Sequence, residues 1–357
     1  RQGQVVRGSG EPLTGAMVAT RPVGPARMVI GARVPAPRST HDDARVCVPG
    51  SLDAGAVAGR IVLCERGAVG RVDKSRAVEL ADGVGMVLVN VGPGSLDEDF
   101  HSVPTVHLAL EPGQDLRRWA AKHPRARVSL RPIGLAPTQR HVASWSSSGD
   151  PSAPVLKPDL VAPATGILGG VPADSRGVPW DFVTGTSAAT AYTTGVAATL
   201  LARRDLSAAE VRSALATTAQ PLRDGVRAAG AGRVRGDDAA TPGLVYPLDV
   251  ADYRPWLEGR RSHLNTPSML LSGDGQSAAR RTVTNVGPRA RYFSSRAVGF
   301  RHDVLVRPAA LRLDPGESAT FRVRVIGRHH VAPHDDGYVV WRGATGTVTR
   351  IPVLISR

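Results

Sequence analysis

The chain carries one hydroxyl group at a position suited to nucleophilic chemistry. Ser187 follows Gly185-Thr186 and precedes a run of small residues in DFVTGTSAATAYTTGVAATLL, residues 181–201. We expect a buried helix to begin here, and a helix N-terminus favours negative charge through its unpaired N–H groups and its dipole. A catalytic serine needs donors for the oxyanion on its substrate and a base for its proton. Ser187 is therefore a candidate nucleophile.

Ser187 also fits a purely structural role. The serine could act only as the N-cap of its helix, a common role for this residue type.

No Gly-x-Ser-x-Gly motif occurs in the chain, which argues against an α/β-hydrolase. GAGRVRG (230–236) lacks the preceding strand that a dinucleotide-binding loop needs. The histidines and aspartates of 329–336 give only weak support to a metal site. We therefore predict no metal and, in the absence of a dinucleotide-binding loop, no cofactor.

Charge and hydropathy argue against two classes of partner. The chain of 357 residues has a formal net charge of +14, yet its basic residues are scattered rather than gathered into a patch. In FRVRV (321–325) the arginines alternate with apolar residues, as on the solvent face of a strand. We expect no nucleic-acid partner. The longest uncharged run, 182–202, is rich in Ser, Thr and Gly, which suit lipid poorly, so we expect no membrane span.

The two cysteines, Cys47 and Cys64, leave two possibilities open. A metal site is disfavoured because no histidine follows them at short spacing. A single disulfide would suit an oxidising compartment, and two buried free thiols fit the sequence equally well.

Several elements must position these residues. The chain begins without an initiator Met or an apolar signal core, so we expect it to start within a longer protein. A hairpin is predicted around Gly8-Ser9-Gly10. Residues 46–130 then alternate between glycine-bounded apolar runs, typical of buried strands, and segments of helical spacing at 74–82 and 114–122. This pattern indicates a compact α/β module.

The second half of the chain changes from mixed structure to strands. A loop containing KPDLVAPATGIL leads to the Ser187 helix. A second helix is predicted from Ser207, because Glu210 three residues later completes a capping box. From residue 264 onward, period-two strands separated by turns predict a β-sandwich.

These motifs together resemble one protein family. GTSAATAYTTGVAATLL resembles the nucleophile helix of subtilisin-like serine proteases, GTSMAxPHxxG, and LKPDLVAPATGIL is similar to the family's KPDIxAPGxxI segment. CVPGSL, GRIVLCERG and VPTVHLAL resemble the protease-associated domain inserted in plant and actinobacterial subtilases. GAGRV with PGLVYPLDVADYRPWL resembles the junction after the catalytic domain. LNTPSMLL, RTVTNVG and the closing strands resemble the fibronectin type III-like domain.

The resemblance implies an α/β fold with three parts. Residues 1–40 would end the first part of a subtilisin-like parallel-sheet catalytic domain, and 41–135 would form the inserted α/β protease-associated domain. Residues 136–260 would complete the catalytic domain, and 261–357 would form the C-terminal β-sandwich. The chain would thus be the C-terminal portion of a secreted, extracellular subtilase.

The resemblance also implies a chemistry. Ser187 matches the nucleophile that attacks a protein or peptide substrate, its N–H would be one oxyanion donor, and Thr186 matches the threonine beside it. The Asp and His of the triad precede the serine in this family, but the sequence holds neither an HGTHV motif nor an Asp-Thr/Ser-Gly motif. None of the upstream histidines matches the triad His: His41, His101, His107, His123 and His141. None of the asparagines matches the oxyanion Asn: Asn90, Asn265 and Asn285.

The isolated chain is therefore predicted to be inactive, and its partner would be the missing N-terminal part of the catalytic domain. We expect His101 and His107, which lie within the protease-associated match, to be structural. Ala188, Ala191 and Tyr192 replace the family's Met, Pro and His, and Ser148 and Asp150 replace an Arg and a Pro. These changes leave an alternative open, a non-catalytic protein-binding remnant of a subtilase.

Overall fold

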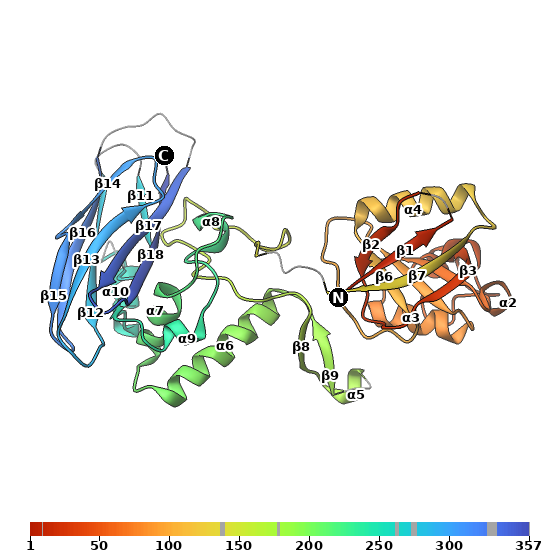
Figure 1. Ribbon diagram of the computed structural model, residues 1–357, viewed down its shortest axis with the longest axis horizontal. Coiled ribbons are helices and arrows are strands. Elements are labelled where there is room, and N and C mark those ends of the chain that lie inside the picture. The colour runs from red at the N-terminus through yellow and green to blue at the C-terminus, as the bar shows by residue number, and fades with distance from the viewer. Residues whose placement is uncertain are drawn as a thin grey trace. The chain divides into compact units, whose positions relative to one another are not determined.

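The computed structural model describes residues 1–8, 10–135, 140–176, 179–260, 264–272, 277–326 and 334–356. The chain divides into two compact units (Figure 1). The first comprises 1–139, 143–145 and 164–188, and the second comprises 140–142, 146–163 and 189–357. Among the described residues, no helix combines the length and the apolar character that crossing a bilayer requires.

A closed barrel forms most of the first unit, with strand order β1-β2-β6-β5-β4-β3-β7 (Figure 1). Strands β3 to β6 run parallel, and β1, β2 and β7 join them antiparallel. Every residue of β4 and β5 is buried, as parallel strands covered on both faces require, so the predicted buried strands are confirmed. The strands are β1 Gln2–Arg7, β2 Leu13–Ala16, β3 Val23–Ile30, β4 Ile61–Glu65, β5 Gly85–Val89, β6 Thr105–Leu108 and β7 Arg127–Gly134.

Helices cover the barrel on two faces. Leu116 and Ala120 of α4 join one apolar cluster with the barrel strands, and Ala77 and Val78 of α3 join a second. Helix α3 contains most of the segment 74–82 that was predicted to be helical, and α4 contains all of the predicted segment 114–122. The helices of this region are α1 His41–Arg45, α2 Ala54–Val57, α3 Arg71–Leu80 and α4 Leu110–Lys122.

The first 40 residues contribute β1, β2 and β3 to this barrel. The hairpin predicted around residues 8–10 is confirmed by the antiparallel pairing of β1 with β2. The resemblance assigns these residues to the catalytic domain, whereas the structure places their strands in the barrel, where each finds two hydrogen-bonded neighbours. Close approach of β2 to β6 requires Gly15, because a Cβ there would lie 2.2 Å from His107 O.

A short hairpin in the first unit precedes the Ser187 helix. Strands β8 (Ile167–Gly170) and β9 (Trp180–Val183) pair antiparallel, and α5 (Ala173–Arg176) lies between them. The hairpin is closed at its base by Gly185 N–H, which donates to Ala164 O at 2.8 Å. Helix α6 (Thr186–Arg203) begins at the next residue.

The expectation that α6 is buried is wrong. Ala188 and Leu200 are buried, but most of its residues are exposed or half-buried. Its apolar residues are mainly alanines, and Leu200 packs with Val196 and Ala197 against α7 (Ala208–Thr217) along one side. The predicted capping box of α7 is confirmed, with Ser207 N–H and Glu210 N–H bonded to each other's side chains.

The parallel catalytic sheet expected in 136–260 is not found in the described residues of that range. They hold the antiparallel β8–β9 hairpin and the strand β10 (Leu244–Val245), plus an isolated parallel bridge between Val161 and Arg233. The remaining helices of the second unit are α8 Val226–Ala229, α9 Gly236–Ala239 and α10 Val250–Leu257.

The predicted β-sandwich is confirmed as two sheets, with orders β10-β12-β16-β14 and β11-β18-β17-β13-β15. Phe293, Phe321 and Trp341 lie in its core, while Arg322 and Arg324 of β16 face solvent as the alternation predicted. Its other strands are β11 Met269–Ser272, β12 Ala278–Asn285, β13 Arg291–Val298, β14 Asp303–Arg307, β15 Ala310–Leu313, β16 Ser318–Ile326, β17 His334–Gly343 and β18 Val348–Ser356.

The sandwich shares buried contacts with the helices before it. Tyr246, which follows β10, is buried in the sandwich core, and its N–H donates to Ser213 Oγ of α7 at 2.8 Å. Asp336 Oδ2 of β17 accepts from Val226 N–H of α8 at 2.6 Å. These residues join the sandwich to α7 and α8 within one unit.

Cys47 and Cys64 form a disulfide with an Sγ–Sγ distance of 1.99 Å and a Cα–Cα distance of 5.7 Å. Cys64 lies on buried β4 and Cys47 follows α1. Free thiols, the other possibility left by the sequence, are thereby excluded among the described residues.

Replacing both cysteines by alanine is expected to lower the unfolding free energy of the first unit by about 3 kcal/mol, because the 17-residue separation then no longer restricts the unfolded chain. Urea unfolding of the double variant, followed by a probe in the barrel, measures this loss. Reduced wild-type protein serves as the control and should unfold at a similar urea concentration. Equal midpoints for oxidised wild type and the variant would contradict the expectation.

Candidate active site

Ser187 lies in the first turn of α6, and its side chain is exposed. Gly185 precedes the helix with φ of 152°, a conformation that residues with a Cβ rarely adopt. Ala188 N–H donates back to Gly185 O at 3.0 Å, which sets the first turn. Thr186 is exposed beside the serine. A substrate carbonyl at this position would meet the N-terminal end of a helix, where the helix dipole favours negative charge.

The upstream histidines occupy separate environments. His41 Nδ1 lies 2.7 Å from Ala32 O, and His123 stacks on Trp119. His141 Nδ1 lies 3.5 Å from an Asp224 carboxylate oxygen. His107 lies on β6 and is buried, and His101 lies in the loop before β6, half-buried but with both ring nitrogens buried.

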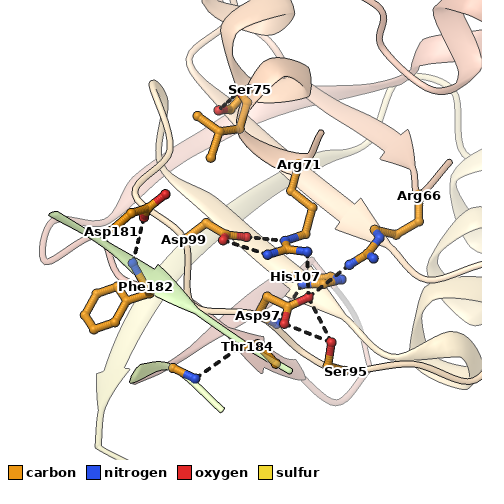
Figure 2. A network of polar contacts seen from close by, with 12 residues as sticks. Arg66, Arg71, Ser75, Ser95, Asp97, Asp99, His107, Asp181, Phe182 and Thr184 are labelled. Carbon is orange, nitrogen blue, oxygen red and sulfur yellow. Dashed lines mark hydrogen bonds and ion pairs between the residues drawn. The ribbon is translucent and has the colours of Figure 1, made fainter. Parts of the chain in front are cut away.

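An ionic cluster of two buried aspartates and two half-buried arginines lies where the barrel meets the hairpin of the first unit (Figure 2). We define it as Arg66, Arg71, Asp97 and Asp99. Arg71 clamps Asp99 with two nitrogen atoms, one of them 2.9 Å from Oδ1, and its third nitrogen lies 3.2 Å from Asp97 Oδ2. Arg66 Nη1 donates to the same Asp97 oxygen at 3.0 Å. Both carboxylates are thus removed from water and paired.

His107 anchors the cluster to strand β6, and its hydrogen bonds identify its tautomer. Asp97 N–H donates to Nδ1 at 3.0 Å, so that nitrogen carries no proton. Nε2 lies 2.8 Å from Asn90 Oδ1 and donates to it, because the Asn90 amide nitrogen faces the carbonyls of Gly94 and Ser95. The ring is therefore neutral in the folded protein.

Burial and neighbouring charges shift the pKa values in this cluster. Burial lowers the pKa of His107 to about 4 and that of His101 to about 4. Burial alone would raise the pKa of Asp97, but the charge of Arg71 and the hydrogen bond from Ser95 outweigh it and hold the pKa below its ordinary value. Burial opposes the charge of Arg71, yet Asp99 raises its pKa overall.

The cluster is continuous with the hairpin that leads to Ser187. Phe100, next to Asp99, stacks on Phe182 of β9 with ring centroids 4.9 Å apart. Asp181 is buried and accepts from Phe182 N–H at 2.8 Å (Figure 2). Its charge contributes to the raised pKa of Arg71.

The sequence indicated that His101 and His107 are structural, but not this cluster. The acidic run of 97–99 and the arginines after β4 are visible in the sequence, yet nothing local pairs them. No group of three or more His, Cys, Asp or Glu in the described part of the chain could hold a metal ion. His329 and His330, the weak metal candidates of the sequence, lie outside the described residues.

Comparisons with known proteins agree with this architecture. A PA domain model matches residues 28–116, and a fibronectin type-III domain model matches residues 263–355. Subtilisin-like protease SBT1.3 of Arabidopsis thaliana is 31% identical over 382 residues, covering 89% of this chain and 49% of that protein. SBT1.4 of the same plant is 36% identical over 245 residues, covering 60% of this chain and 32% of that protein.

The chain belongs to the subtilisin-like protease family, and it includes the PA domain and the fibronectin type III-like domain. It spans about half the length of SBT1.3. Among solved structures, the Pseudomonas aeruginosa CupB2 chaperone matches 26% of this chain and 53% of its own, at 12% identity and a TM-score of 0.22. This last likeness carries no argument about function.

The buried histidines predict how stability of the first unit depends on pH. Their pKa values lie below 6.5 in the folded state, so between pH 6.5 and 4 the unfolded chain binds more protons. The contribution of the two neutral histidines to stability is therefore fully present above pH 6.5 and is lost as the pH decreases towards 4. The measurement is the urea midpoint of the barrel at pH 7 and at pH 5.

His107→Gln tests the assignment, since glutamine keeps polar groups but does not titrate. We expect its fall in midpoint from pH 7 to 5 to be roughly half that of wild type, with His101 supplying the rest. His123→Gln, at an exposed position, is the control and should behave as wild type. Equal falls for His107→Gln and His123→Gln would show that His107 is not responsible.

Proposed function

We propose that this chain supplies the nucleophile of a secreted subtilisin-like serine endopeptidase, with Ser187 in that role. The single observation that carries the proposal is the exposure of Ser187 in the first turn of α6, after Gly185. Membership of the subtilisin-like protease family supports it. The substrate would be a protein or peptide.

In the proposed reaction, Ser187 Oγ attacks the carbonyl carbon of a peptide bond. A base takes the hydroxyl proton and passes it to the departing amine, and the acyl-enzyme left on Oγ is hydrolysed by water. The developing oxyanion accepts a hydrogen bond from Ser187 N–H at the helix N-terminus. Thr186, beside the nucleophile, would support this oxyanion site.

The base, its aspartate and the second oxyanion donor would come from a part of the catalytic domain outside this sequence. A serine without its base retains about 10³–10⁴-fold catalysis over water from the oxyanion hole and substrate binding. With one oxyanion donor also missing, the chain by itself is proposed to be inactive. The 136–260 region would then join a parallel sheet formed with that other part.

An alternative function is a non-catalytic protein-binding remnant of a subtilase. Ala188, Ala191 and Tyr192, which depart from the family pattern, favour it. Ala188 is buried, and Tyr192 is 42% exposed. Neither covers the exposed side chain of Ser187, which is why catalysis stays the first proposal.

A fluorophosphonate probe tests the nucleophile directly. In a protein that joins this chain to an upstream subtilase segment with the Asp, His and Asn motifs, the probe should label Ser187. Ser187→Ala should abolish labelling and reduce peptide cleavage to the residual ~10³–10⁴-fold level over water. The chain alone should not react.

Ser207 provides a matched internal control. It also lies at a helix N-terminus, but its Oγ donates to Glu210 Oε2 at 2.8 Å in a capping box. Ser207→Ala should leave labelling unchanged. Equal labelling of both serines, or none at Ser187 in the joined protein, would refute catalysis, and the second result would favour the binding alternative.

A further inference from the structure

We propose that the loop of residues 95–102, part of the PA-domain barrel, positions Ser187 by holding the β8–β9 hairpin. The proposal rests on the proposed role of Ser187 as nucleophile. It assigns Phe100 and Arg71 as positioning residues, which act through the hairpin and do not touch the substrate.

The direct contact between loop and hairpin is aromatic. Phe100 and Phe182 stack with an interplanar angle of 28° and centroids 4.9 Å apart. Phe100 is still 48% exposed, so the barrel core does not depend on its ring. A large apolar side chain that is half exposed and stacked on one neighbour contributes to that contact more than to folding of its own domain.

The loop that carries Phe100 is held on both sides. Before it, the fork of Arg71 on Asp99 and the Asp97 bonds fix the backbone (Figure 2). After it, Ser102 N–H donates to Ser75 Oγ of α3 at 3.1 Å. The ring of Phe100 therefore stands in a fixed place relative to the barrel.

Charge adds a second link between the same two segments. Asp97, Asp99 and Asp181 are buried carboxylates near Arg71, and Asp181 belongs to β9 of the hairpin. Removing the guanidinium would leave these carboxylates with less compensating charge, which is costly away from water. The hairpin is thus attracted to the same arginine that fixes the loop.

The hairpin leads directly to the serine. Gly166 N–H donates to Thr184 Oγ1 at 3.0 Å, and Gly185 N–H donates to Ala164 O at 2.8 Å. These bonds lock the base of the hairpin immediately before α6 begins at Thr186. Because a displacement of about 1 Å can slow an enzymatic step ~10²-fold, support of this base matters to a nucleophile placed there.

The first experiment measures the contact without relying on activity. In the full chain, hydrogen exchange of the β9 amides and of Gly166 and Gly185 is compared between wild type and Phe100→Ala. We expect roughly two- to tenfold faster exchange, the range for loss of one aromatic pair. Tyr292→Ala, which removes a 65% exposed aromatic from the sandwich, is the control and should leave these amides unchanged.

The second experiment reads the serine. In the joined protein used above, Phe100→Ala should slow fluorophosphonate labelling of Ser187 and lower kcat with little change in KM, while the barrel's unfolding midpoint stays the same. Arg71→Met should act in the same direction. Arg71→Lys keeps the charge but not the fork, so it should recover only part of the labelling rate.

The outcomes separate the two proposals. Unchanged exchange in Phe100→Ala overturns the positioning role, and so does faster exchange with an unchanged labelling rate. In both cases wild-type Ser187 is still labelled, and its role as nucleophile stands. A wild-type protein that is not labelled refutes the nucleophile and, with it, the positioning role.

Discussion

The pairing of Arg71 with Asp99 and Asp97 is the interaction on which the arrangement around Ser187 depends. Carboxylates removed from water are tolerated only when opposite charges and hydrogen-bond donors replace the solvent. Arg71 meets this need with a fork on one aspartate and a third contact to the other. Because that geometry is specific, it fixes the loop that holds both aspartates. It therefore also fixes Phe100 of the same loop, which stacks on Phe182 of β9.

The helix that carries Ser187 combines local order with exposure. Its first turn is set by Gly185 and by the closed base of the hairpin, while its small side chains bury little area of their own. A helix of this composition gains little from packing, and in proteins packing provides most helical stability. Its N-terminal geometry therefore depends on what holds the preceding strand.

Local pattern predicted much of the fold. The apolar runs of β4 and β5, the capping box at Ser207 and Glu210, and the alternation in β16 each need only a few neighbouring residues. The ionic cluster could not be predicted in this way, because Arg71 and Asp99 are 28 residues apart and nothing between them signals the pairing. The prediction that α6 is buried was wrong because the hydropathy of a segment indicates that it can be buried, but not that a partner surface exists to bury it. The motif around Ser187 identified the candidate nucleophile. It gave no sign of the loop of residues 95–102 that contacts the β8–β9 hairpin before this serine.

The chemistry of arginine explains why this chain, with three lysines among its 45 basic residues, can hold charge inside its domains. Burial lowers the pKa of Arg281 in the sandwich only to about 10, so its guanidinium stays charged at neutral pH and donates to Thr266 O and Ser268 O. Burial brings the pKa of Lys74 to about 8, where a small further change would remove its charge. A lysine in place of Arg71 would keep a positive charge beside Asp97 and Asp99 but would lack the planar fork. The position next to the hairpin therefore needs arginine for its shape, which pairs with two carboxylates at once.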